Sequence, residues 1–402
     1  MKKYLLVMIM SVAVLAAFNS CKNETVNPPA PNAESLSGSI TGTKTLDAKV
    51  TYTLAGALVV EEGGVLNIPA GTVIKSKKGF GNYILVLMGG KINVNGTADK
   101  PVIMTADDEA NASSGYWGGL IINGKAKVSG DWTTGKTPTG QTEIANAYLY
   151  GGTDNADNSG SITYLIIKYP GARSSADIEH NGLTLNGVGN STKIENLYIY
   201  KSADDGVEFF GGSVNITNLL VVNDDDDMFD FTQGYTGTVT NCYGIWEKGF
   251  SSNESDPRGI EGDGNLDGAY PNHTNQSDCK FVNATFDLRI DADANQTNIA
   301  TQMMDVIKLR RGAKATITNA LVKGTGNVKN LINFDDSKGA GNVASVVSLT
   351  NGLTNKTLVN GGKEIVPGKD ANGVALSYPN AKIDAANTGC ATTVFAWTGY
   401  KF

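Results

Sequence analysis

The chain has 402 residues, 41% of them hydrophobic, which is enough for one long repetitive core or for two domains of average size. The formal net charge is −7, so a nucleic-acid partner is not expected. Only two histidines are present, His180 and His273, which argues against a histidine-rich zinc site and against histidine-based catalysis. The low charged fraction of 18% and the 48 glycines favour short strands and frequent turns.

The first 20 residues have the pattern of a signal peptide: two lysines, then an apolar run that is too short to span a membrane comfortably. The Ser-Cys pair that follows resembles a bacterial lipoprotein signal in the looser form seen in Bacteroidota, which implies lipidation of Cys21. A plain secretory signal with an incidental cysteine is the alternative. Residues 21–37 are polar and contain prolines, so we expect a tether. "KNE" after Cys21 resembles a surface-export signal, and we therefore expect a lipid-anchored outer-membrane protein facing outward.

From residue 38 onward the sequence alternates apolar and polar positions in short runs. "GGVLNIPAGTVIKS" and "MGGKINVNGTADKPVIMTA" each contain a Gly-Gly, a strand, a turn and a second strand. Related runs begin at Ile162, Ile194, Ile216, Val239 and Ile317. The steps from Ile194 to Ile216 and on to Val239 are 22 and 23 residues, a period typical of solenoids. We therefore predict that residues 38–402 form one all-β parallel β-helix domain, whose coils stack at about 4.8 Å.

Several longer motifs resemble a known family. "GGKINVNGTADKPVIMTA", "YWGGLIINGKA", "HNGLTLNGVG" and "DDGVEFFGGSVN" are similar to segments of the right-handed parallel β-helix outer-membrane lipoproteins of Bacteroidota. The resemblance implies a right-handed solenoid over most of the chain. The pair "DDGVEF…DDMFDF" also resembles the calcium-site coils of pectate-lyase-like β-helices.

Two segments break the alternation and are predicted to project from the coils as loops, where binding residues tend to collect. They are Trp132–Ala147 and Lys248–Asp278. Trp132 lies in a polar context and is our candidate for stacking on a sugar ring. The apolar and aromatic residues 389–402 are predicted to cap the last coil, because an open end of a β-helix is an unpaired edge.

Acidic residues recur at the coil period. With Asp205 and Asp227 one coil apart, Glu208 and Asp230 are predicted to point outward and to stack, and Glu261 extends the column. Asp204 and Asp226 belong to the same face, whereas the direction of Asp205 and Asp227 is left open. The predicted metal ligands are Asp204, Glu208, Asp226, Asp227, Asp230 and Glu261.

Stacked carboxylates repel each other by roughly 1–3 kcal/mol per pair at about 5 Å, and a divalent cation removes that repulsion. Ca²⁺ accepts six to eight oxygen ligands in adaptable geometry, whereas Mg²⁺ prefers a strict octahedron. No histidine or cysteine lies in the cluster, which argues against zinc and copper. The sequence thus favours Ca²⁺, with a hydrated acidic surface as the alternative.

Calcium raises the question of catalysis. The resemblance to pectate-lyase-like enzymes implies a polysaccharide lyase, in which a Lys or Arg near the ion removes a proton from a uronate. Lys248 and Arg258 are the candidate bases, and Lys201 is a more distant one. Each has the alternative of being an ordinary surface cation, because no motif surrounds it.

Cys242 and Cys279 occupy related strand positions and form either a disulfide, which export would permit, or two buried thiols, the interpretation we prefer. The leading functional prediction is a non-enzymatic surface lipoprotein, stabilised by calcium, that binds a glycan or serves as an accessory subunit of an outer-membrane uptake or assembly complex. The competing prediction is a calcium-dependent lyase acting on acidic polysaccharides, and a purely structural stalk or adhesin is the third.

Overall fold

The computed structural model describes residues 32–402 except 176–177 and 293–297. The predicted signal peptide, the lipidation of Cys21 and most of the predicted tether lie outside the described residues. Strand β1 (Asn32–Ile40) already begins within the stretch expected to be tether. Among the described residues, none lies in a helix with the length and apolar character required to cross a bilayer.

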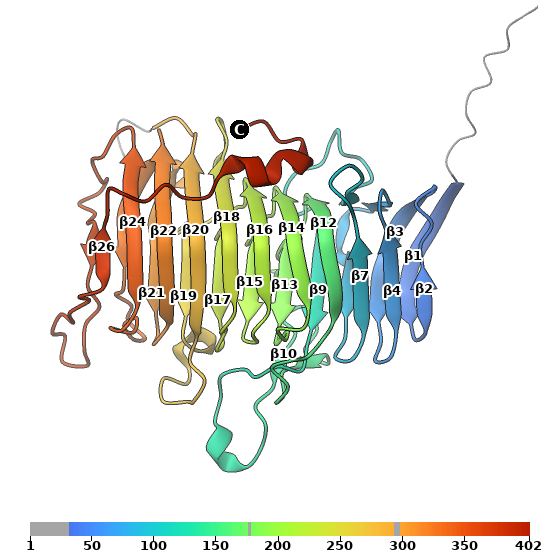
Figure 1. Cartoon of the computed structure of the whole chain (residues 1–402), viewed down its shortest axis with the longest axis horizontal. Helices are drawn as coiled ribbons and strands as arrows, with labels where there is room; N and C mark the ends of the chain where they lie inside the picture. The colour runs from blue at the N-terminus through green and yellow to red at the C-terminus, as the bar shows by residue number, and fades with distance from the viewer. Residues whose placement is uncertain (1–31, 176–177, 293–297) are drawn as a thin grey trace, which may run out of the picture. The chain divides into compact units, whose positions relative to one another are not determined.

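The described chain is a right-handed parallel β-helix, as predicted. Its strands pair in parallel in one 24-stranded sheet, and Figure 1 shows them side by side from the blue to the red end. After β1 the early strands are β2 (Thr43–Thr45), β3 (Val50–Val60), β4 (Val65–Pro69), β5 (Val73–Ser76), β6 (Gly79–Val86), β7 (Lys91–Asn95), β8 (Val102–Ala106) and β9 (Trp117–Asn123). A projecting loop follows with η1 (Trp132–Thr134) and an antiparallel pair, β10 (Gly140–Gln141) and β11 (Leu149–Tyr150).

In the later coils, successive strands belong alternately to two stacks, here called the first and the second file. Within each file, every strand pairs in parallel with the equivalent strand of the next coil. The first file contains β12 (Gly160–Lys168), β14 (Lys193–Tyr200), β16 (Asn215–Val222), β18 (Thr238–Trp246), β20 (Asp278–Leu288), β22 (Lys314–Gly324), β24 (Val346–Leu353) and β26 (Ala381–Ile383). The second file continues from β9 through β13 (Leu183–Asn186), β15 (Val207–Phe210), β17 (Phe229–Thr232), β19 (Arg258–Asp263), β21 (Gln302–Arg310), β23 (Asn327–Asn333) and β25 (Ile365–Val366). The short helices η2 (Leu266–Gly268), η3 (Ile299–Thr301) and η4 (Thr392–Thr398) lie between or after them.

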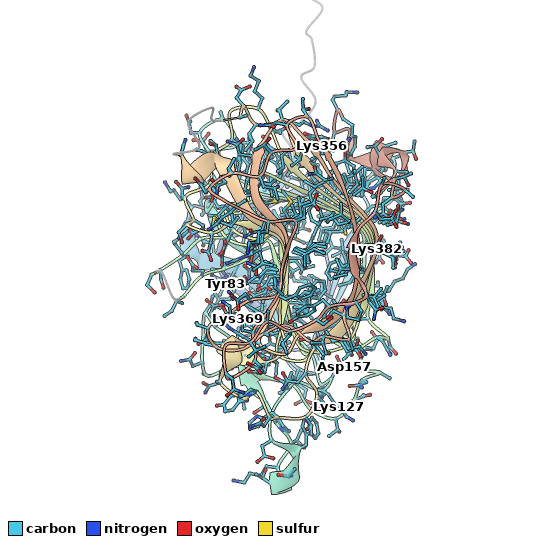
Figure 2. The ribbon with its side chains drawn as sticks, turned by 90° about the vertical axis from the view of Figure 1, so that its left-hand side faces the viewer. Tyr83, Lys127, Asp157, Lys356, Lys369 and Lys382 are labelled. Atoms are coloured by element: carbon cyan, nitrogen blue, oxygen red, sulfur yellow. The ribbon has the colours of Figure 1, made fainter. Side chains whose placement is uncertain are left out.

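The repeats read from the sequence are confirmed by the strand register. Ile162 lies opposite Ile194, which lies opposite Ile216, and Val239 follows on the next coil. Phe281 separates Val239 from Ile317 in the same column. These side chains are buried in the interior, where Figure 2 shows side chains filling the space enclosed by the strands.

A ladder of asparagines stabilises one corner of the coils. The Nδ2 atom of each asparagine donates to the Oδ1 of the one before it, at 2.8–2.9 Å, through Asn196, Asn218, Asn241, Asn283 and Asn319. Each has a φ between +53° and +61°, a left-handed conformation that asparagine tolerates better than most side chains. Asparagine therefore suits the bend in these five coils, and the amide stack satisfies its hydrogen bonds; on β12 the equivalent position is Tyr164, with a φ of 51°.

The C-terminal segment differs from the expected cap. Instead of covering the last coil, η4 packs against the outer face of β12, β14, β16 and β18, where Figure 1 shows it crossing the strands in red. Phe395 is fully buried against Leu220 and Tyr243 in this second apolar cluster. The hydroxyl of Tyr400 donates to Glu247 Oε1 at 2.9 Å, which ties the segment to the end of β18.

The cysteines follow the preferred interpretation. Cys242, Cys279 and Cys390 are buried free thiols. In the register of β18 and β20, Cys242 lies opposite Ala284, five positions beyond Cys279, and at about 3.3 Å per residue this separation is too large for a disulfide.

Candidate metal centre

The predicted acidic column is present in the structure. Glu208 on β15 lies opposite Asp230 on β17, and Asp230 lies opposite Glu261 on β19. Thr184 precedes the column and Lys308 follows it. Phe209 and Phe231, one position further along their strands, are fully buried in the interior, so the alternation of the strand directs the acids to the outer face.

A second polar column runs three residues earlier in each coil. Asn181, Asp205 and Asp227 are linked there through the backbone: Asp205 N donates to Asn181 Oδ1 at 3.2 Å, and Asp227 N donates to Asp205 Oδ1 at 2.9 Å. Arg258 and Asp305, which are register partners, extend the column. These bonds resolve the direction of Asp205, which the sequence left open, because its carboxylate faces the next coil.

Three groups of carboxylates have oxygens within 4.8 Å of one another. They are Asp204–Asp205–Asp226, Asp205–Glu208–Asp230 and Asp227–Asp230–Glu261. All six predicted ligands belong to one of these groups. Asp205, which was not among the predicted ligands, belongs to two of them, as does Asp230.

The carboxylates are buried from water, and several of their oxygens lack a hydrogen-bond donor among the described residues. Asp226, Asp227 and Asp230 each have a buried Oδ1 that accepts no hydrogen bond from the described residues. Burial, and then the neighbouring Glu261 and Asp263, raise the pKa of Asp230 well above its usual value. For Asp226 burial raises the pKa to about 7, although Arg258 opposes the shift. The folded chain thus resists full ionisation of this cluster.

Protein cations compensate one end of the cluster. Arg258 Nη1 lies 2.6 Å from Glu261 Oε1 and 3.7 Å from Asp227 Oδ2, and Arg310 also pairs with Glu261 and with Asp263. The Asp205–Glu208–Asp230 group has no such pair among the described residues. Its one side-chain donor is neutral, Asn181 Nδ2, which bonds Glu208 Oε2 at 2.6 Å. This group is consequently the best place for an added cation.

Two projecting loops add acids that the sequence did not reveal. Glu179 N donates to Glu143 Oε1 at 3.1 Å, and burial raises the pKa of Glu143 to about 7. After burial, Glu179 and then Asp226 are the main causes of the raised pKa of Asp204. The loops therefore lie beside the start of the column. The period of the coils does not extend into these loops, so it could not predict their contact with the column.

The two candidate bases are placed differently from what a lyase requires. Arg258 is buried, and its guanidinium is held by Asp227, Asp256, Glu261 and Asp305, which raise its pKa and make it a counter-ion. The side chain of Lys248 is 78% exposed and has its Nζ 3.7 Å from Asp291.

Lys248 instead lines a separate cavity of about 390 Å³, together with Lys201, Tyr200 and Asp225. None of the acids in the three candidate groups lines that cavity. A role for Lys248 in chemistry at the acidic column therefore has no support in this geometry.

Lys308 is the lysine that sequence reasoning missed. It is the register partner of Glu261, burial lowers its pKa, and its Nζ donates to Asp335 O at 2.6 Å. The segment expected to be one loop, Lys248–Asp278, contains β19, so it forms two loops on either side of a strand. That break in the period concealed the place of Lys308 in the column.

Trp132 is less available than expected. Its Nε1 donates to Val128 O at 3.1 Å, and the Lys127 ammonium lies 5.4 Å from the ring centroid. The ring is half-buried, and a cation already occupies one face.

Taken together, the coils and the acids define a parallel β-helix with a candidate centre for a hard divalent cation. The chain belongs to the family described as the pectate-lyase like beta helix domain, whose model matches residues 38–400. Comparison with curated proteins and with solved structures gave no match.

Proposed function

We propose that the protein is a calcium-stabilised β-helix that binds a glycan. The observation that carries the calcium part is the Asp205–Glu208–Asp230 group, whose oxygens lie within 4.8 Å of one another without a paired cation. Three carboxylates supply three to six of the oxygens that Ca²⁺ takes, and Asn181 lies beside them. The absence of histidine and cysteine from the group disfavours zinc.

The family supports the glycan part. A pectate-lyase-like β-helix domain is consistent with a role connected with polysaccharides. The enclosed position of the acids favours a structural ion over one that bridges a passing substrate. We therefore assign the ion to stability and the glycan to another surface of the molecule.

Calcium binding is tested by titration calorimetry on protein freed of metal with EGTA. We expect Ca²⁺ to bind with a micromolar or tighter Kd and Mg²⁺ to bind at least tenfold more weakly. Glu208→Gln should weaken Ca²⁺ binding at least tenfold, whereas Asp291→Asn, a change in an exposed acid that pairs with Lys248, should not. Equal heats for the two variants would contradict the assignment.

The location is also a proposal. We infer that lipidated Cys21 anchors the protein to the outer face of the outer membrane, where a glycan or a membrane protein complex would be its partner. Incorporation of an alkyne-labelled fatty acid that Cys21→Ser abolishes, together with cleavage by protease added to intact cells, would support this placement. A secreted, unlabelled protein would contradict it.

A calcium-dependent lyase is the second candidate, and Lys308 is the observation that favours it. A lysine with a lowered pKa beside the acidic column has the chemistry of a proton acceptor. Polygalacturonate incubated with the calcium-loaded protein, with the ultraviolet absorbance of unsaturated products as readout, tests it. Activity that disappears in Lys308→Ala but not in Lys248→Ala would establish this candidate.

A further inference from the structure

Exposed large apolar side chains gather in one cleft. Leu149, Leu266 and Tyr270 are 43%, 39% and 47% exposed, and all three line a cavity of about 600 Å³. The cleft lies between the loop that carries η1, which projects from the coils in Figures 1 and 2, and the loop after β19. An antiparallel bridge between Gly130 and Thr274 joins the two loops. Neither loop contributes to the interior core at these positions, so apolar exposure there requires another explanation.

Tyr270 is held as a platform. Its backbone N donates to Asn265 Oδ1 at 3.0 Å, and its carbonyl accepts from Gln276 Nε2 at 3.2 Å. The ring stacks on His273 with centroids 4.4 Å apart and planes 8° from parallel. One face of the ring is thereby covered by the imidazole, while the side chain as a whole remains 47% exposed. A fixed aromatic face is suited to the apolar C–H face of a sugar ring.

Amides supply the polar part of the lining. Gln233 is 5% exposed, and its Oε1 accepts the Tyr150 hydroxyl at 2.6 Å, which fixes the orientation of the amide. Its Nε2 donates to no other described residue and is left for a ligand. Gln141 and Asn146 also line the cleft, and their side-chain amides make no hydrogen bond within the described chain. Amides can both donate to and accept from hydroxyl groups.

The charges of the cleft select against acidic ligands. No lysine or arginine is among its lining residues, and Asp131 contributes one carboxylate. His273 is the other ionisable side chain of the lining, so a polyanion such as polygalacturonate would meet one carboxylate and no permanently charged lysine or arginine. The lining thus combines an aromatic face, apolar side chains and uncharged amides.

We propose that this loop cleft binds an uncharged oligosaccharide, with Tyr270 stacked against a pyranose ring and the amides of Gln141, Asn146 and Gln233 bonded to its hydroxyls. The inference rests on the proposed glycan-binding function, for which it names the site and the class of ligand. It places the glycan on the loops and away from the acidic column.

The test is titration calorimetry with hexasaccharides of β-1,4-glucan, α-1,4-glucan, β-1,4-mannan and β-1,4-xylan, with hexagalacturonate as the acidic comparison, all in millimolar Ca²⁺. At least one neutral hexasaccharide should bind more tightly than hexagalacturonate. Tyr270→Ala should lower that affinity at least tenfold, whereas Tyr270→Phe, which keeps the ring, should stay within about threefold. Val374→Ala, at a side chain that is 62% exposed and does not line the cleft, is the control.

Three results would overturn the inference: no binding of any neutral hexasaccharide, tighter binding of hexagalacturonate, or neutral binding that Tyr270→Ala leaves unchanged. Circular dichroism of each variant verifies its fold. Calcium binding is measured independently, so a failure of the metal assignment with Tyr270-dependent sugar binding intact would leave this inference standing. Sugar binding that is insensitive to Tyr270 would preserve the glycan function and remove only this site.

Discussion

Removing calcium should lower the thermal stability of the β-helix, and Asp230→Asn should eliminate this dependence. Asp230 belongs to two of the three carboxylate groups, so its charge is opposed by both Glu208 and Glu261. At 4.8 Å and an effective dielectric constant of about 20, two like charges repel by about 3.5 kcal/mol. The variant therefore lacks one of the proposed calcium ligands. In the absence of metal it also lacks the repulsion between Asp230 and the carboxylates of Glu208 and Glu261.

The expected size of the effect follows from mass action. Ca²⁺ present at about one hundred times its Kd stabilises the folded state by about 2.7 kcal/mol. With an unfolding entropy of about 2.1 cal/mol/K per residue, that free energy raises the Tm of a domain this large by about 3 °C. In EGTA, Asp230→Asn should melt at or above the temperature of the native chain, because the substitution relieves repulsion that no ion screens.

Differential scanning calorimetry in EGTA and in millimolar Ca²⁺ measures the rise in Tm that calcium causes and the difference in Tm between Asp230→Asn and the native chain. Asp291→Asn is the control. The control should retain the full calcium response, because Asp291 is exposed and pairs only with Lys248 among the described residues. A native chain whose Tm is the same in EGTA and Ca²⁺, or an Asp230→Asn variant that still responds, would refute the reasoning.

In EGTA, the free energy of unfolding should fall as the pH rises from about 4 to about 8. The pKa of Asp226 is about 7 in the folded chain, so the folded state keeps a proton that the unfolded state releases near pH 4, and the difference corresponds to on the order of 4 kcal/mol. Urea unfolding across this range checks the sign, and a rise with pH would contradict it. Asn241→Ala should lower stability by about 2 kcal/mol in urea, because it breaks two bonds of the amide ladder, while Asn241→Gly separates the backbone contribution. Lys248→Ala should shift the Tm by less than about 1 °C, since exposed ion pairs contribute little; a larger shift would show a role that the exposed pair does not explain. The thiols of Cys242 and Cys279 are buried, which raises the pKa of each, and should react with a thiol reagent only after unfolding; prompt labelling of the native protein would be the contrary result.

Periodicity predicted the part of the structure that repeats. The 22-residue offset placed Glu208 beside Asp230. Glu261 follows Asp230 by 31 residues, so the second register pair came from aligning the similar coil segments and not from a constant period. The same alignment contained the place of Arg258, which lies three residues before Glu261 as Asp227 lies three before Asp230. Reading that column would have identified the arginine as a counter-ion instead of a candidate base.

Contacts between loops could not be predicted in this way. Glu143 and Glu179 reach the column from segments that have no period, and Tyr270 meets Leu149 across a cleft formed by two separate insertions. Trp132 was the sequence candidate for sugar stacking because it stands in a polar stretch. Its exposure, however, is decided by Lys127 and by the carbonyl of Val128, which are local contacts that polarity alone does not indicate.

The return of η4 across β12 to β18 affects the order in which the molecule can mature. Strands near the middle of the chain are synthesised well before Phe395. Their outer apolar side chains stay exposed until the C-terminal segment that contains η4 covers them. An intermediate in which all coils are formed but the last dozen residues are undocked would therefore expose an apolar surface over β12 to β18. Such an intermediate would be prone to associate with other copies until the C-terminal segment docks.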